Sequence, residues 1–253
     1  MSQKNQYGKT PDGGMHGLPD SPVEGLVPTM NNTGWMTVSL DEVSAAFAAY
    51  AGTIGEEVLD IGCAYGIATL AALEAGARVL ACDIEPRHLE VLQRRADPAW
   101  RERLRCRAGA MPAVDFDCGS FGAVLASRVL HFLSGDDIEE TVGKMYAWLR
   151  PRGRLFLVAD SPYTGPWRDL SDDYERRKAE GDSWPGFVAD YAQFLPAGAD
   201  PLQHPDFINP LDPDILARVC TDAGFEIEQA RFLHGGTKRS TARDHAGVIA
   251  IRA

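Results

Sequence analysis

Two acidic residues and two glycines, placed at the ends of apolar stretches, have the spacing of a nucleoside-binding site. Residues 58–66 read Val-Leu-Asp-Ile-Gly-Cys-Ala-Tyr-Gly, so a short apolar strand is expected to run into a turn that holds Gly62 and Gly66. Glycine lets the chain turn sharply and approach a ligand closely before a helix begins. Asp83 ends the next apolar stretch, about 20 residues farther on, where a carboxylate can accept both hydroxyl groups of a ribose.

The turn departs from the pattern that binds a dinucleotide. That pattern is G-x-G-x-x-G, and here Ala64 and Ile67 stand at its second and third glycine positions. A nicotinamide-dependent oxidoreductase is therefore the weaker alternative. Asp83 has an alternative role as well, because an Asp after a strand often caps a helix, and Pro86 suits the first turn of a helix that runs to about Ala96.

The elements that would position these residues follow from hydrophobic periodicity. A helix is expected from Ser39, since Leu40, Val43 and Phe47 have helical spacing and Ser39 with Glu42 forms a capping box. The strands that we expect lie near residues 57–61, 78–83, 103–107, 121–127, 153–159, 225–233 and 246–251. Helices between the first five strands, including 68–75, favour a doubly wound, mostly parallel α/β sheet, and a further helix that opens at Asp212 and Pro213 precedes the last two strands.

The order of these motifs over residues 38–160 resembles a class I S-adenosylmethionine-dependent methyltransferase of the small-molecule branch. Asp60, Gly62 and Gly66 match the acidic residue and glycines of that family's first motif, while Ala64 replaces its middle glycine. Residues 121–127 resemble its fourth strand, and residues 149–157 resemble its fifth strand and the turn before it.

The resemblance implies a cofactor, a fold and a cofactor site. The cofactor is S-adenosylmethionine, with Asp83 on its ribose and Ile84 against its adenine. The fold is a Rossmann-like sheet of seven strands, six parallel and the last one antiparallel, with the cofactor beyond the carboxyl ends of the first two strands. The residues that we expect to contact the cofactor are Asp60, Gly62, Cys63, Ala64, Gly66, Asp83, Ile84, Ala110, Met111, Ser127 and Arg128.

An aromatic-rich segment, residues 161–210, follows the fifth strand and lies beyond the motifs that resemble the family. It holds eight aromatic residues, interleaved with proline and acidic residues. One interpretation is a lid, because insertions at the carboxyl edge of such a sheet lie above the ligand. The other is a satellite core that packs on the sheet. The acceptor-binding residues that we expect are Tyr163, Trp167, Trp184 and Tyr191 from this segment, together with His131 and Trp35. Trp35 belongs to a stretch at residues 31–36 that either closes over the cofactor or the acceptor or is an ordinary turn anchored by its Trp.

Few catalytic side chains are needed, because a sulfonium methyl is already activated. His131, just beyond the fourth strand, and Tyr163 are the candidate catalytic residues. An unperturbed histidine titrates near 6.5, which suits a general base. The alternative is that His131 only packs near the cofactor. His16, His204 and His234 lie in turn-rich segments and are weaker candidates.

Composition limits the partners. The chain has 253 residues and a formal net charge of −11, so a nucleic-acid substrate is not expected. We expect no membrane span, no metal, a small-molecule substrate, a cytoplasmic location and five free cysteine thiols. Residues 1–34, rich in glycine and proline, are expected to lack regular structure and to form an arm that is flexible or folds over another part of the protein, before a methyltransferase domain at 35–253. The oligomeric state can be a monomer or a homodimer. The alternative function is a non-catalytic protein that binds the cofactor or regulates a partner methyltransferase.

Overall fold

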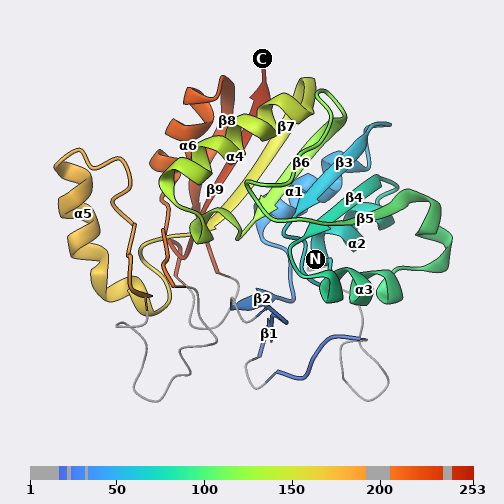
Figure 1. The fold of residues 1–253 in the computed structure, drawn as a ribbon, viewed down its shortest axis with the longest axis horizontal. Helices are drawn as coiled ribbons and strands as arrows, with labels where there is room; N and C mark the ends of the chain where they lie inside the picture. Colours follow the sequence, from blue (N-terminus) through green and yellow to red (C-terminus); the bar gives the residue numbers. More distant parts are fainter. Residues whose placement is uncertain (1–16, 22–23, 32–33, 192–205, 236–240) are drawn as a thin grey trace.

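The computed structural model describes residues 17–21, 24–31, 34–191, 206–235 and 241–253 (Figure 1). Within them the chain forms two sheets flanked by helices. The strands are β1 (Leu26–Pro28), β2 (Trp35–Thr37), β3 (Glu57–Ile61), β4 (Arg78–Asp83), β5 (Leu104–Ala108), β6 (Phe121–Ser127), β7 (Leu149–Asp160), β8 (Phe225–Leu233) and β9 (His245–Arg252). The α-helices are α1 (Glu42–Ala51), α2 (Ile67–Glu74), α3 (Pro86–Arg95), α4 (Gly135–Trp148), α5 (Ser171–Ala179) and α6 (Pro213–Asp222).

The main sheet has seven strands in the order β5-β4-β3-β6-β7-β9-β8. The strands β3 to β7 pair in parallel, whereas β9 is antiparallel to both of its neighbours, β7 and β8. Six strands therefore point one way and the last strand points the other, which confirms the predicted fold class. The order reverses at β3, so the carboxyl ends of β3, β4 and β6 open a crevice where ligands bind in such sheets.

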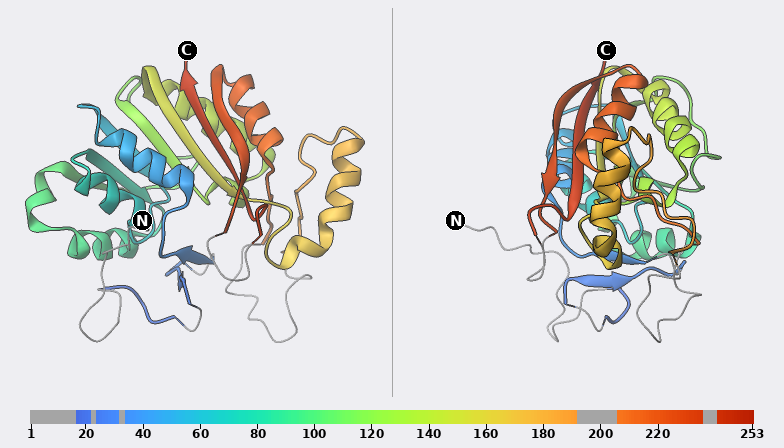
Figure 2. Two further views of the ribbon diagram at one scale, coloured as in Figure 1. Left: turned by 180° about the vertical axis from the view of Figure 1, so that it is seen from behind. Right: turned by 90° about the vertical axis from the view of Figure 1, so that its left-hand side faces the viewer.

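Two layers of helices bury the two faces of this sheet. Helices α4 and α6 share one hydrophobic core with the strands, and α1, α2 and α3 share the other. Figure 2 shows the sheet between these layers, with the β1–β2 hairpin beneath the carboxyl ends of the strands. None of the helices in the described segments is long and apolar enough to cross a membrane.

The predicted elements are largely confirmed, because their sequences favour one structure. β3 is apolar at Val58, Leu59 and Ile61, and its Val58 and Leu59 are fully buried, as expected for a strand covered on both faces. Pro86 does open α3, and Asp212 caps α6 by accepting a hydrogen bond from the backbone N–H of Ile215. The N-cap of α3 is Glu85, so Asp83 is not the capping residue of this helix.

Two predictions about the N-terminal region are wrong. The capping box at Ser39 does not form, since α1 begins at Glu42 and Asp41 is its cap, accepting from the backbone N–H of Ser44 at 2.8 Å. The segment before residue 35 was expected to lack regular structure, but Leu26–Pro28 pairs with Trp35–Thr37 in a hairpin. Residues 1–16 lie outside the described part of the chain, and so do His16 and His204.

Candidate functional site

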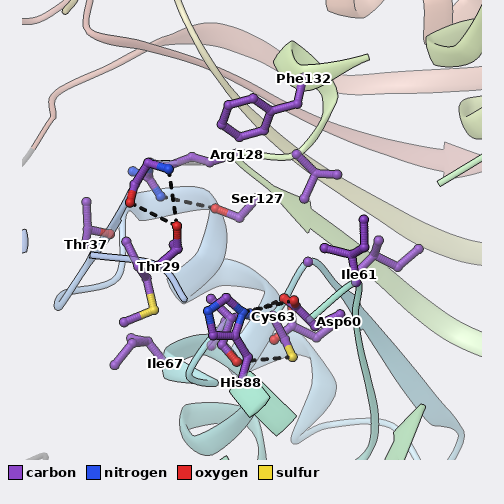
Figure 3. Close-up of a pocket in the computed structure, with 18 of the residues that line it drawn as sticks. Thr29, Thr37, Asp60, Ile61, Cys63, Ile67, His88, Ser127, Arg128 and Phe132 are labelled. Atoms are coloured by element: carbon purple, nitrogen blue, oxygen red, sulfur yellow. Dashed lines mark hydrogen bonds and ion pairs between the residues drawn. The ribbon is translucent and has the colours of Figure 1, made fainter. Parts of the chain in front are cut away.

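A cavity of about 420 Å³ lies at the carboxyl ends of β3, β4 and β6. This volume is within the range of small-molecule sites. The β1–β2 hairpin and the start of α1 cover the cavity on the side away from the sheet. Figure 3 shows Asp60, Cys63 and His88 at one end of it and Phe132 at the other, with Ser127 between them. Ten of the eleven residues predicted to contact the cofactor line this cavity; only Gly66 does not.

The turn after β3 has the backbone that the sequence predicted. Gly62 and Gly66 have φ of +65° and +79°, a region that favours glycine. A Cβ at Gly62 would lie 2.3 Å from Val129 Cγ2, and one at Gly66 would lie 2.3 Å from Leu92 Cδ1. Gly66 therefore acts through packing: it is the N-cap of α2 and lets that helix approach α3. Of the two glycines, only Gly62 lines the cavity.

Ala64, which replaces the middle glycine of the motif, has a φ of +44°. Such a conformation is unfavourable for a residue with a Cβ. Its backbone N–H donates a hydrogen bond of 2.7 Å to Asp83 Oδ2, which offsets the cost and joins the turn after β3 to the end of β4. The Asp83 carboxylate, which was predicted to bind the ribose, thus also stabilises the turn that has Ala64 in place of the motif's middle glycine.

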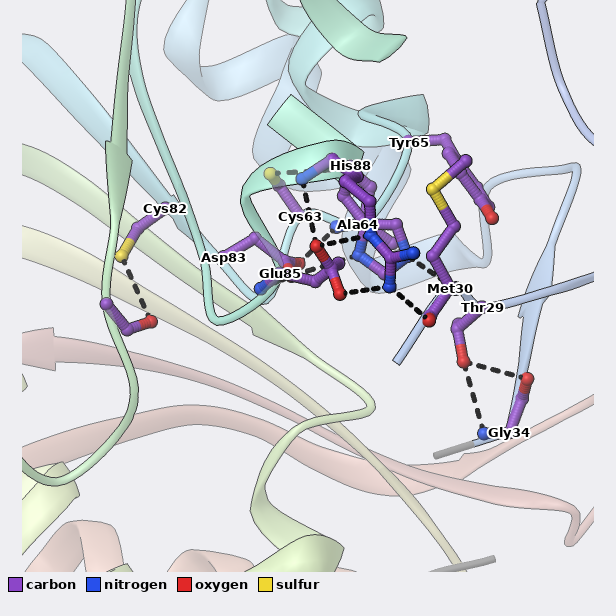
Figure 4. Close-up of polar contacts among 12 residues, drawn as sticks. Thr29, Met30, Gly34, Cys63, Ala64, Tyr65, Cys82, Asp83, Glu85 and His88 are labelled. Atoms are coloured by element: carbon purple, nitrogen blue, oxygen red, sulfur yellow. Dashed lines mark hydrogen bonds and ion pairs between the residues drawn. The ribbon is translucent and has the colours of Figure 1, made fainter. Parts of the chain in front are cut away.

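Asp83 is almost fully buried at the wall of the cavity. Besides Ala64, its carboxylate accepts from the backbone N–H of Glu85 at 2.9 Å, and its Oδ1 lies 3.0 Å from His88 Nδ1 (Figure 4). Hydrogen bonds from several donors fix the direction of a carboxylate and leave lone pairs for a ligand, because an ionised carboxylate has about four acceptor sites. Ile84 follows it with a side chain that is 60% exposed.

Asp60, at the end of β3, is buried and accepts a hydrogen bond of 2.6 Å from the Thr69 hydroxyl. Burial raises the pKa of Asp60 to about 7, although the Thr69 hydroxyl opposes this shift. The nearby Asp83 contributes in the same direction as burial, because two like charges repel.

An ion pair marks the other wall of the cavity. Arg128 Nη1 lies 3.1 Å from Asp41 Oδ2, and both side chains are largely buried. Burial alone would raise the pKa of Asp41, but Arg128 and the hydrogen bonds from Ser44 outweigh it and hold this pKa below its usual range. Arg128 has a φ of +59°, and its buried Nε finds no acceptor among the described residues. A strained backbone and an orphaned donor at a cavity wall are the marks of a binding residue.

His131 lies behind the wall of the cavity, although its neighbours Val129 and Phe132 line it. The side chain is buried, and its Nδ1 accepts a hydrogen bond from the backbone N–H of Asp160 at 3.1 Å. Burial lowers the pKa of His131 to about 4, partly opposed by the negative charge of Asp160. A histidine with so low a pKa is a weak general base, and its place behind the cavity wall favours the alternative that His131 packs beside the cofactor site.

The aromatic residues after β7 pack on one another instead of lining the cavity. Trp167 and Tyr191 form a small core with Ile208, and Trp184 contacts Gly135 and stacks under Arg218. These contacts support the satellite-core interpretation for the described part of the segment. The part of the predicted lid at residues 192–205 lies outside the described residues.

The candidate base Tyr163 is also away from the cavity. Its hydroxyl is hydrogen bonded to Glu175, and Arg243 stacks on its ring. Burial and the bond to Glu175 raise the pKa of this hydroxyl above its usual range. A phenol in that state is a poor proton acceptor at neutral pH.

The hairpin supplies residues that the sequence patterns identified only in part. Trp35, predicted to contact the acceptor, does line the cavity and is 44% exposed. Thr29, Met36 and Ser44 line it too, and so does His88. Trp35 and Met36 belong to the stretch at residues 31–36 that the sequence singled out. No local motif identifies Thr29, Ser44 or His88, because these residues reach the cavity through tertiary packing. In the described segments no group of three or more His, Cys, Asp or Glu side chains is arranged to hold a metal ion.

Comparison with known proteins agrees with this geometry. Residues 58–153 match the family model of a methyltransferase domain. Over 104 residues the chain is 33% identical to a ubiquinone biosynthesis O-methyltransferase of Methylocella silvestris, covering 41% of this chain and 40% of that protein. Over 132 residues it is 31% identical to a cypemycin N-terminal methyltransferase of Streptomyces, covering 51% and 47%. The chain thus spans less than half the length of these relatives.

Solved structures share the fold. A S-adenosylmethionine-dependent methyltransferase of Methanosarcina mazei superposes with a TM-score of 0.59 at 19% identity, over 78% of this chain and 92% of that one. The 1,6-didemethyltoxoflavin N1-methyltransferase of Burkholderia thailandensis, solved with its substrate and S-adenosylhomocysteine, gives 0.56 at 19%, over 83% and 76%. Residues 58–153 are therefore a methyltransferase domain, set in the fold of the S-adenosylmethionine-dependent methyltransferases.

Proposed function

We propose that this protein transfers the methyl group of S-adenosylmethionine to a small, apolar or aromatic metabolite. The observation that carries the proposal is the meeting of the Gly62 turn and the Asp83 carboxylate at one end of a single cavity. A ribose needs an acceptor for its two hydroxyls, and Asp83 is the ionisable acceptor at the strand end where nucleosides bind in this kind of sheet.

The cavity residues fit the parts of the cofactor. Asp83 is suited to the ribose, and the exposed apolar side chain of Ile84 is suited to the adenine. The amino acid end of the cofactor carries a carboxylate, and the orphaned Nε of Arg128 is a donor for such a group. Gly62 lines the cavity, and only glycine fits there because a Cβ would overlap the Val129 side chain.

The remaining end of the cavity fits an acceptor with an apolar body. Phe132 lies at that end (Figure 3), and the cavity lining as a whole includes the apolar residues Met36, Met111 and Leu133 and the large aromatic surface of Trp35. The relatives named above are, by their names, an O-methyltransferase of ubiquinone biosynthesis, a methyltransferase of the cypemycin N-terminus and an N1-methyltransferase of 1,6-didemethyltoxoflavin. We infer a small molecule of secondary metabolism as the acceptor, and the acidic chain, at −11, speaks against a nucleic-acid substrate.

When bound, the cofactor supplies an activated methyl group. The chain's own residues then have to hold the acceptor in line with it and exclude water. The hairpin residues Trp35 and Met36 cover the cavity and serve the second task. His131 lies behind the cavity wall, its Nδ1 already accepts from the backbone N–H of Asp160, and its low pKa makes it a weak base. It therefore contributes positioning instead of general-base catalysis, and an acceptor that is nucleophilic without assistance is favoured.

A titration with S-adenosylhomocysteine tests the cofactor site. Asp83→Ala should weaken binding by about 1.5–3 kcal/mol, the worth of hydrogen bonds to a charged group. Asp172→Ala, which removes an exposed carboxylate on α5, is the matched control and should bind like the wild type. Equal affinity in the two variants would contradict the ribose assignment.

Methyl transfer itself separates an enzyme from a binding subunit. Radiolabelled methyl from S-adenosylmethionine should enter a component of a host metabolite extract in the presence of the protein. Binding of the cofactor with no transfer across broad extracts would instead favour the non-catalytic alternative.

A further inference from the structure

We propose that His88 is a two-sided positioning residue for the cofactor site: its Nδ1 orients the ribose carboxylate, and its Nε2 fastens the hairpin that closes the cavity. This inference rests on the proposed function. Neither role is visible in the sequence, where His88 stands inside a predicted helix.

The first side of His88 faces Asp83. The imidazole is 1% exposed, and its Nδ1 lies 3.0 Å from Asp83 Oδ1. Asp83 Oδ2 is meanwhile fixed by the backbone N–H of Ala64. The carboxylate is therefore held from both oxygens, so its remaining lone pairs point in a fixed direction before any ligand arrives, which lowers the cost of binding.

The second side of His88 faces the hairpin. The backbone N–H of Met30 donates a hydrogen bond of 2.9 Å to His88 Nε2. A nitrogen that accepts carries no proton, so in the neutral ring the proton is on Nδ1, where it donates to Asp83. The two contacts thus require the same tautomer and support each other (Figure 4).

Other contacts at the same point show that the hairpin is anchored here. Arg87 Nη2 donates to the carbonyl of Met30 at 2.7 Å, and the Tyr65 hydroxyl donates to the carbonyl of Pro28 at 2.8 Å. Tyr65 also packs its ring edge against His88, with 4.7 Å between the ring centroids. Thr29, between these anchor points, and Trp35 on the returning strand both line the cavity. Fastening Met30 therefore places the cover of the cavity.

Two substitutions separate the two sides. Asparagine places its amide near the position of Nδ1, so His88→Asn retains a donor for Asp83 and loses the acceptor for Met30. Glutamine reaches the position of Nε2, so His88→Gln retains an acceptor for Met30 and loses the donor for Asp83. Tyr65→Phe removes only the bond to Pro28 and serves as a control, because Tyr65 does not line the cavity.

The measurements are the dissociation constant of S-adenosylhomocysteine and the hydrogen exchange of the Met30 amide. His88→Gln should weaken binding about tenfold, the lower end for a hydrogen bond to a charged group, with exchange close to wild type. His88→Asn should retain affinity within about threefold, while Met30 exchanges about fivefold faster, as expected when one neutral hydrogen bond is lost. Tyr65→Phe should speed exchange in the hairpin and leave affinity unchanged.

The opposite patterns would overturn the inference. If both His88 variants changed affinity and exchange to the same extent, the histidine would be a packing residue only. If Tyr65→Phe weakened binding as much as His88→Gln, the effect on affinity would belong to the hairpin and not to Asp83. Failure of the wild-type protein to bind S-adenosylhomocysteine would overturn the proposed function, and this inference with it.

Discussion

Gly62→Ala is expected to destabilise the protein and weaken cofactor binding, whereas Gly143→Ala is expected to stabilise it. Gly62 has a φ of +65°, and a Cβ there would lie 2.3 Å from Val129 Cγ2. The left-handed conformation costs about 1–2 kcal/mol for a residue with a Cβ. Relieving the overlap adds about 1–3 kcal/mol. A smaller gain from the stiffer unfolded chain, about 0.4–1 kcal/mol, acts in the other direction.

Gly143 provides the opposite case with the same chemical change. It lies on the exposed face in the middle of α4, has no φ in the left-handed region, and a Cβ there meets nothing within 4 Å. Alanine in a helix interior is better than glycine by about 1 kcal/mol. Thermal unfolding of the two variants should therefore shift Tm in opposite directions, by roughly 2–4 °C per kcal/mol for a chain of this size.

A double variant separates the two costs at Gly62. Val129→Ala removes the methyl group that the new Cβ would overlap, so adding it to Gly62→Ala should recover the steric part of the loss and leave the conformational part. The reasoning would be refuted if Gly62→Ala unfolded at or above the Tm of the wild type. It would also be refuted if Val129→Ala gave no recovery in the Gly62→Ala background.

Three further predictions follow from buried polar groups. The pKa of His131 is near 6.5 in the unfolded chain and about 4 in the folded protein, so between these values the unfolded chain binds more protons and stability should fall with falling pH, by on the order of 3 kcal/mol. Chemical denaturation at pH 4 and pH 7 should show a smaller pH effect for His131→Asn than for the wild type. An equal pH effect in the two proteins would contradict the assignment. Arg128→Met leaves the buried Asp41 carboxylate without its cation and should lower the free energy of unfolding in urea by about 3–5 kcal/mol. The double variant Arg128→Met, Asp41→Leu should lose less, because no buried charge is left without its partner. Thr69→Val should cost about 1–3 kcal/mol because Asp60 loses its hydrogen bond; equal midpoints for wild type and variant would argue against that contact.

The sheet was predictable because its strands are local patterns. β3, β4 and β6 were expected at the residues where they occur, since each is an apolar run that ends at a turn or an acidic residue. The cofactor end of the cavity was predictable for the same reason, because the carboxyl ends of adjacent parallel strands meet at one edge.

The parts that were missed depend on contacts between distant segments. Ser39 and Asp41 both suit a helix cap by their residue types, and the structure uses Asp41, whose carboxylate also pairs with Arg128 far along the chain. His88 has the pattern of a helix residue, and its role arises only because Met30 folds back over it. The aromatic density after β7 was visible, but density alone does not say whether rings face a ligand or, like Trp167 and Tyr191, one another.

A crystal structure of the protein with S-adenosylhomocysteine tests the central claim most directly. We expect the ligand in the cavity, with both ribose hydroxyls within hydrogen-bonding distance of the Asp83 carboxylate, the adenine against Ile84, and the sulfur facing the end of the cavity lined by Phe132. A ligand bound elsewhere, or one whose ribose makes no contact with Asp83, would contradict the assignment of this cavity to the methyl donor.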